Sequence, residues 1–170
     1  MPEFLKILLI RHEPPIALSA NLRAGMAAII GMSLVGAISA WTGLPLLLAP
    51  LGATAGLLFG QPSSPLSQPV NVMGGYLVGT IVCEGAFLFF PGEWIAVAAA
   101  VGLTIVLMRG LRVTHSPAAA LPILGFGEPV HGLELFMVVF LSSVLLISLA
   151  FVVHRIPPKR PYPLPADHRD

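Results

Sequence analysis

The sequence contains very little charge. Only 10% of its 170 residues are Asp, Glu, Lys or Arg, whereas soluble domains carry about 25%. Between residues 24 and 153 the charged residues are Glu84, Glu93, Arg109, Arg112, Glu128 and Glu134. So few charges cannot cover a domain of this length with groups that water solvates. The shortage excludes a soluble domain and indicates an integral membrane protein whose main solvent is the lipid bilayer.

Other absences exclude classes of function. The formal net charge is +1 and there is no basic stripe to neutralise phosphates, which argues against a nucleic-acid partner. The single cysteine, Cys83, excludes an internal disulfide and is expected to pack in its apolar run. The sequence has no nucleophile–base pair, no cofactor fingerprint and no two-histidine metal motif. We therefore expect neither an enzyme nor a bound cofactor.

Four apolar stretches are long enough to span a bilayer as helices. Residues 24–42, 70–90, 94–112 and 133–153 each contain 19 to 21 residues, which corresponds to roughly 30 Å of helix. Trp41 and Trp94 lie at the ends of two of these stretches, where aromatic residues meet the membrane surface. The predicted fold is an all-α helical membrane bundle.

Two further apolar stretches, residues 44–60 and 113–127, are short and contain Pro50 and Pro117. As re-entrant loops they would leave four crossings, and as broken crossing segments they would make six. With six crossings and a cytoplasmic N-terminus, all 9 Lys and Arg residues fall on the inner side, as the positive-inside rule prefers. With four crossings, Arg109 and Arg112 move outside. We predict six crossings in a bacterial plasma (inner) membrane, with both termini cytoplasmic.

The charge pattern divides the chain into three parts. Residues 1–23 form a cytoplasmic segment in which residues 3–10 are an interfacial helix, and no cleavable signal peptide is expected. Residues 24–153 form the transmembrane domain. Residues 154–170 form a cytoplasmic tail, which is rich in proline and expected to be disordered from residue 156.

The two broken stretches resemble each other at an offset of 67 residues. When residues 49–62 are laid over residues 116–129, six of the fourteen positions are identical. With six crossings, residues 24–90 and 94–153 each contain a helix, a broken segment and a helix. Three crossings per half place the second half upside down relative to the first. Such inverted repeats with interrupted helices are typical of secondary transporters.

The broken stretches also predict an anion site. Pro50 and Pro117 each favour the first turn of a short helix that reaches only half-way through the bilayer. Two helix N-termini then face each other near the midplane with free N–H groups, and Ser116 is a candidate cap. His115 donates to the anion or carries a coupled proton, unless it is a hydrogen-bonded interior residue. The predicted substrate-binding residues are Leu51, Gly52, Ala53, Thr114, His115, Ser116 and Ala118.

Two motifs carry a family resemblance. THSPAAALP at residues 114–122 and SPLSQPVNVMGGYLVG at residues 64–79 resemble the HPP family of small integral membrane proteins, over residues 23–153. Members of that family are associated with nitrite transport, so the resemblance implies a small-anion permease; the family is usually described with four spanning helices. This sequence departs from the pattern at Ser116, where the motif has proline, and at Val70 and Tyr76, where basic residues are frequent. These departures weaken the case for nitrite in particular.

The remaining polar residues leave alternatives open. Gln61, Ser64, Gln68 and Asn71 either line the pathway or form a turn and helix cap. Glu84 is placed for proton coupling or for a hydrogen bond to a neighbouring helix. The group Glu128, His131 and Glu134, spaced by three, is either a divalent-cation site or the acidic start of the last helix.

Three functions follow from these readings. The first is a transporter or channel for a small inorganic anion. The second is a divalent-cation or proton-coupled permease that uses Glu84 and the Glu128, His131 and Glu134 group. The third is a membrane partner subunit that transports nothing. Glycine-rich helices, among them the one containing Gly74, Gly75 and Gly79, predict close helix packing and a homo-oligomer.

Overall fold

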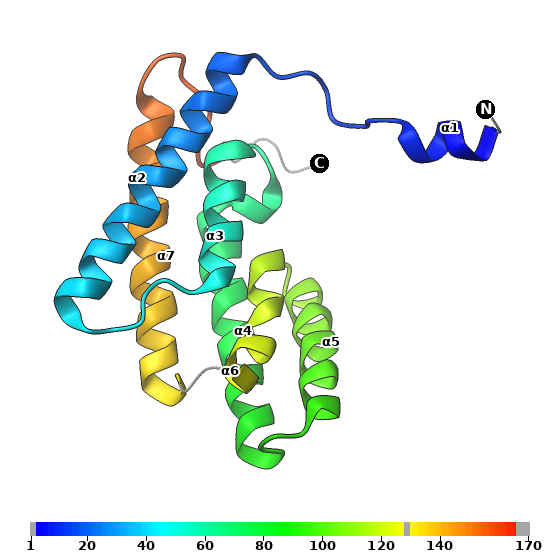
Figure 1. Ribbon diagram of the computed structural model, residues 1–170, viewed down its shortest axis with the longest axis vertical. Coiled ribbons are helices and arrows are strands. Elements are labelled where there is room, and N and C mark those ends of the chain that lie inside the picture. Colours follow the sequence, from blue (N-terminus) through cyan, green and yellow to red (C-terminus); the bar gives the residue numbers. More distant parts are fainter. Residues whose placement is uncertain (1–2, 128–129, 166–170) are drawn as a thin grey trace.

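The computed structural model describes residues 3–127 and 130–165, and all regular secondary structure in these residues is helical (Figure 1). This confirms the all-α prediction. In chain order the elements are α1 (Glu3–Leu9), α2 (Leu18–Thr42), α3 (Ala49–Ala55), η1 (Gly56–Gly60), η2 (Pro65–Ser67), α4 (Pro69–Phe89), α5 (Trp94–Gly110), η3 (Ser116–Ala120), α6 (Leu121–Gly127) and α7 (Gly132–Arg155).

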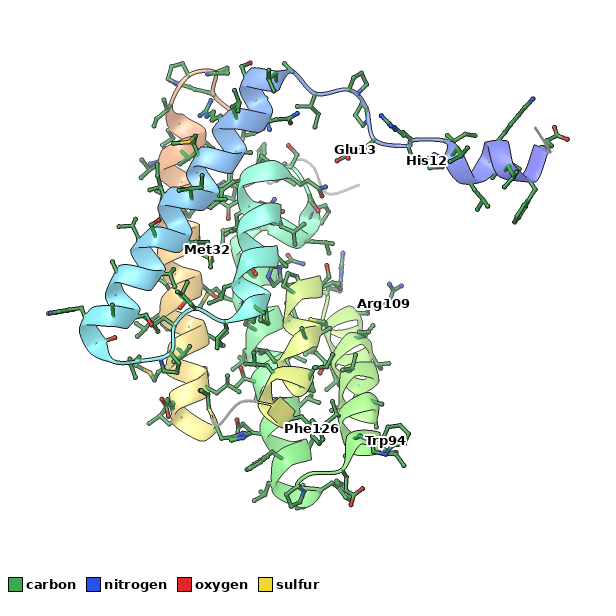
Figure 2. The ribbon with its side chains drawn as sticks, viewed as in Figure 1. His12, Glu13, Met32, Trp94, Arg109 and Phe126 are labelled. Carbon is green, nitrogen blue, oxygen red and sulfur yellow. The ribbon has the colours of Figure 1, made fainter. Side chains whose placement is uncertain are left out.

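Three helices are long and apolar enough to cross a membrane: α2, α4 and α7. The fourth predicted span, α5, has 17 residues, and Trp94 and Arg109 lie at its two ends (Figure 2). α2 begins at Leu18 rather than at residue 24, so the predicted N-terminal segment contributes its last residues to this helix. α1 lies apart from the bundle (Figure 1), and all its residues are exposed.

The two broken stretches form short helical rods between the long helices. α3 continues into η1 over Ala49–Gly60, and η3 continues into α6 over Ser116–Gly127. Successive segments alternate in direction: in Figure 1 α2, α4 and α6 run downward, whereas α3, α5 and α7 run upward. α4 lies at the centre, where it packs against α5, α6 and α7, while α2 packs against α7 and η1.

Local sequence explains why the chain leaves α2 and starts again at α3. Gly43 has a φ of 74° and ends α2 in the left-handed conformation, which glycine adopts without steric cost. The following residues are tied to α2 because Ser39 Oγ donates to the Leu44 carbonyl at 2.6 Å. Leu48, the N-cap of α3, is extended, and Pro50 lies in the first turn of α3.

Glycines on α4 allow the chain before η3 to lie directly against this helix. A Cβ atom at Gly75 would lie 2.6 Å from Cβ of His115, and one at Gly79 would lie 2.6 Å from the Ala118 carbonyl oxygen. Both distances are too short for any side chain. The predicted small-residue face therefore serves packing within the chain, and a homo-oligomer would need a different surface.

The end of the chain departs from its expected disorder. Residues 156–165, here called the C-terminal strap, fold back over the loop before α4. The Tyr162 hydroxyl donates to the Ser67 carbonyl at 3.1 Å, and the Leu164 N–H donates to Gln68 Oε1 at 2.9 Å. Tyr162 is only 7% exposed, and burial raises the pKa of its phenol. Prolines and mixed charges suggested disorder, but the buried Tyr162 ring and hydrogen bonds at Tyr162 and Leu164 hold the segment.

The glycine contacts predict different effects of alanine at two positions of α4. Gly79→Ala forces a methyl group against the Ala118 backbone and should destabilise the protein by about 1–3 kcal/mol. Gly85→Ala is the matched control, since nothing lies within 4 Å of its Cβ position. We expect the control to be neutral or stabilising by up to about 1 kcal/mol. Thermal unfolding of the two variants in detergent compares them, and equal midpoints would contradict the contact.

Candidate functional site

The two short rods begin beside each other in the interior of the bundle. α3 contacts η3, and Thr54 Oγ1 lies 2.9 Å from His115 Nε2. Thr54 is one turn into α3, while His115 directly precedes η3 in extended conformation. Tyr76 of α4 joins them, with its hydroxyl 2.6 Å from Thr54 Oγ1. We call Thr54, Tyr76 and His115 the central triad.

The hydrogen bonds of the triad have a defined direction. His115 Nδ1 lies 2.8 Å from the Leu66 carbonyl, and because a carbonyl only accepts, Nδ1 carries a proton. In the neutral ring Nε2 is then an acceptor, so it accepts a hydrogen bond from the Thr54 hydroxyl, which also lies 3.1 Å from the Pro50 carbonyl. The Tyr76 hydroxyl in turn donates to Thr54 Oγ1. The result is a directed chain from phenol to hydroxyl to imidazole to carbonyl.

This chain is closed off from its surroundings. Thr54 and His115 are 0% exposed and Tyr76 is 3% exposed. The rings of Tyr76 and His115 meet edge to face, with centroids 5.0 Å apart. Since every member has a partner, the burial of these polar groups is compensated. The sequence analysis singled out His115 but missed Thr54. A hydroxyl side chain within a broken apolar segment could have pointed to it.

The structure divides the predicted substrate-binding residues. Leu51, His115 and Ala118 are buried, whereas Gly52, Ala53 and Ser116 are exposed and Thr114 is intermediate. His115, and not Ser116, is the residue that caps the second rod, and it makes no side-chain cap hydrogen bond. The first parts of the two rods, α3 and η3, contact each other, and buried side chains of Thr54 and His115 make this contact.

A cavity of about 190 Å³ lies next to the triad, between α4 and α7. Its lining is largely apolar and includes the polar residues Tyr76, Thr80 and Ser143. Ser143 is 0% exposed, and its hydroxyl has no hydrogen-bond partner within the described parts of the chain. A buried hydroxyl without a partner is costly unless water or a ligand bonds to it. Sequence reasoning missed Ser143, although two adjacent serines in an apolar helix were a visible signal.

The polar loop predicted to line a pathway mainly holds itself together. Ser64 Oγ accepts from the Leu66 N–H at 3.2 Å, and Gln68 Nε2 donates to the carbonyls of Pro62 and Ser64, each at 2.9 Å. Asn71 Nδ2 donates to the Thr114 carbonyl at 3.1 Å, while Gln61 is exposed. This arrangement agrees with the turn interpretation, and the loop positions Leu66 for its bond to His115.

Glu84 lies beside His131, which the sequence analysis had grouped with Glu128 and Glu134. Its Oε1 lies 3.8 Å from Nδ1 of His131, whose ring stacks on Phe87 with centroids 3.6 Å apart. Glu134 is exposed, and Glu128 lies outside the described residues. Within the described part of the chain no three potential ligands gather to hold a metal ion. The predicted three-residue group is thus replaced, among described residues, by a carboxylate–imidazole pair.

Comparison with known proteins gives the same family as the two sequence motifs that contain His115 and Asn71. Residues 13–163 match the family described as HPP, transmembrane region. The chain belongs to the HPP transmembrane family. Its membrane location follows from this membership and from the apolar helices.

Two relatives of this HPP protein are transmembrane proteins of Dictyostelium discoideum. One is 32% identical over 129 residues, which cover 71% of this chain and 45% of the relative. The other is 30% identical over 126 residues, which cover 69% of this chain and 40% of the relative. The HPP chain thus spans less than half the length of these curated relatives. No solved structure matches it.

The triad predicts an unequal response to loss of two buried hydroxyls. Thr54→Val leaves His115 Nε2 and the Tyr76 hydroxyl without their shared partner and should destabilise the protein by about 1–3 kcal/mol. Thr104→Val is the control, because Thr104 is equally buried but its hydroxyl bonds to Ala100 of its own helix at 2.8 Å. Unfolding in detergent measures both variants. A loss at Thr54 no larger than at Thr104 would contradict the network.

Proposed function

We propose that this protein is a transporter for a small inorganic anion, with its site at the central triad. The observation that carries the proposal is the meeting of two oppositely directed short helices around a buried hydroxyl–imidazole network. Interrupted helices that meet inside a bundle are the usual plan of a transporter site. Nitrite is one candidate substrate, and nitrate, formate and chloride are others of the same charge.

We further propose that the bundle is a 3+3 inverted repeat with six crossings. Support comes from the directions in Figure 1, since α2, α3 and α4 run down, up and down whereas α5, η3–α6 and α7 run up, down and up. Each half also contains a short rod with a proline as its second residue, Pro50 and Pro117. Under this proposal both termini lie on the cytoplasmic side of a bacterial plasma membrane.

The triad suggests how an anion and a proton would travel together. With neutral His115, Nε2 is an acceptor and repels an anion. Protonation converts Nε2 into a donor. It then no longer accepts the hydrogen bond from the Thr54 hydroxyl. An anion that reaches the triad from the adjacent cavity finds this imidazolium and the Tyr76 hydroxyl. The anion and the imidazolium together carry no net charge, which lowers the cost of placing the anion in a low-dielectric interior.

Flux measurements in proteoliposomes test this function. We expect saturable uptake of at least one of nitrite, nitrate, formate and chloride, and faster uptake when the outside is more acidic. His115→Gln should lower the flux at least about tenfold because it cannot take up the proton, and Tyr76→Phe should lower it less. Thr104→Val, buried but outside the triad, should transport normally. If none of the four anions shows saturable flux, the proposal fails.

The Glu84–His131 pair favours a second candidate, a proton-coupled or cation permease. Neither Glu84 Oε1 nor His131 Nδ1 has a hydrogen-bond partner within the described residues, although they lie 3.8 Å apart. A proton or a cation between them would satisfy both atoms.

Neutral substitution separates the two candidates. Under the second candidate, Glu84→Gln should remove proton- or cation-dependent uptake, while Glu134→Gln, an exposed carboxylate on α7, should leave it unchanged. Under the first candidate, anion flux depends on His115 and survives both substitutions. A common effect of Glu84→Gln and Glu134→Gln would remove the reason for assigning a role to the pair.

A further inference from the structure

A small basic cavity lies at the end of the bundle where α2 begins and α7 ends. Its volume is about 80 Å³, and Arg23, His154 and Arg160 are its ionisable lining residues. The other lining residues are apolar or small and polar, so none of the described residues around it carries a carboxylate. The cavity lies well away from the triad in the fold, since it is bounded by the first turns of α2, the last turn of α7 and the C-terminal strap.

Arg23 forms one wall and holds the strap in place. Its guanidinium donates to the carbonyl oxygens of Val153 and Ile156 and to that of Pro158 at 2.8 Å. The last carbonyls of a helix have no partner within the helix and carry partial negative charge. Arg23 therefore caps α7, and these three bonds leave part of its five-donor fork unused.

His154 supplies a polar atom that nothing in the described structure satisfies. Its Nε2 lies 2.8 Å from the Leu58 carbonyl, so Nε2 carries a proton and donates. Its Nδ1 is buried and has no hydrogen-bond partner among the described residues. The whole side chain is 3% exposed and lines the cavity. In the neutral ring this Nδ1 is an acceptor, so the ligand that satisfies it either brings an O–H donor or favours a second proton on the ring.

Arg160, a residue of the C-terminal strap, forms the wall of the cavity on the strap side. Its backbone N–H donates to the His154 carbonyl at 3.1 Å, which places residue 160 beside the end of α7, and its side chain lines the cavity. Arginine matches the geometry of phosphate-like oxyanions because its planar fork donates two parallel hydrogen bonds. The cavity is small and has room for a group of a few heavy atoms.

We propose that Arg23, His154 and Arg160 form a binding site for a phosphate-like oxyanion. The ligand is either the phosphate of an anionic lipid headgroup or a free oxyanion, because both present the same oxygens. The two guanidinium groups supply charge and directed donors. An anion held between them offsets their charge and favours a proton on Nδ1 of His154, which then supplies a further donor. A ligand here would bond to α2, α7 and the strap together. The site stands independently of the transport proposed for the triad.

Binding measurements on the purified full-length protein test the site. One arm titrates inorganic phosphate and follows the unfolding temperature in a neutral detergent. The other arm measures retention of phosphatidylglycerol against phosphatidylcholine by native mass spectrometry. Arg160→Gln should weaken binding at least about tenfold, the value of one charged hydrogen bond. Arg155→Gln removes the same charge from an exposed neighbour that does not line the cavity and should leave binding unchanged.

The outcomes separate the sources of the ligand and test the site itself. Loss of phosphatidylglycerol retention alone in Arg160→Gln assigns the site to a lipid headgroup, loss of the phosphate response alone assigns it to free oxyanions, and loss in both arms shows that the site accepts either source. His154→Gln keeps a donor for Leu58 but removes Nδ1, so a weakened affinity in that variant supports the ring nitrogen's role. Equal losses in Arg160→Gln and Arg155→Gln would mean unspecific surface attraction and would overturn the proposal. So would the absence of any response to both ligands in the unsubstituted protein.

Discussion

The imidazole of His115 is the point on which the interior of this protein depends. Its Nδ1 donates to Leu66 in the loop before α4, and its Nε2 accepts from Thr54 in α3. Its Cβ lies against Gly75 of α4. One side chain thus joins the start of the second rod to three other segments. In a low-dielectric interior these hydrogen bonds are strong when all are made and costly when one is missing, so the four segments hold one another in place.

The same contacts close the centre of the bundle. A permanent opening between the two rods would leave the triad's hydroxyls and ring nitrogens exposed to whatever enters. Here the groups bond to each other instead, and the cavity beside Tyr76 lies between α4 and α7. In the proposed transport an anion has to replace a partner within the network, and this exchange is favourable only when His115 has gained a proton. Closure and proton coupling are then two consequences of one arrangement.

The sequence predicted the parts of the fold that depend on composition and on proline. Missing charge identified the membrane domain, and Pro50 and Pro117 marked the two rods. It did not predict which side chains would meet, because that depends on the depth and rotation of each rod. Thr54 faces His115 whereas its neighbours Gly52 and Ala53 are exposed, because each residue turns the side chain by roughly 100° around the helix axis. His131 was assigned to a group by its spacing along one helix, but the contact with Glu84 comes from a different helix.

The strap was the least predictable element, because a proline-rich sequence does not reveal a single buried tyrosine contact. Its importance lies in the loop it covers. Leu66 and Ser67 are adjacent: the carbonyl of Leu66 accepts from His115, and the carbonyl of Ser67 accepts from Tyr162. The loop is therefore held from inside by the triad and from outside by the strap. Because the strap is also anchored by Arg23 at the end of α7, a movement of the strap that releases Tyr162 frees one side of the loop that orients His115. The hydrogen bonds at the end of the bundle are thus linked to those at its centre through the strap and the loop.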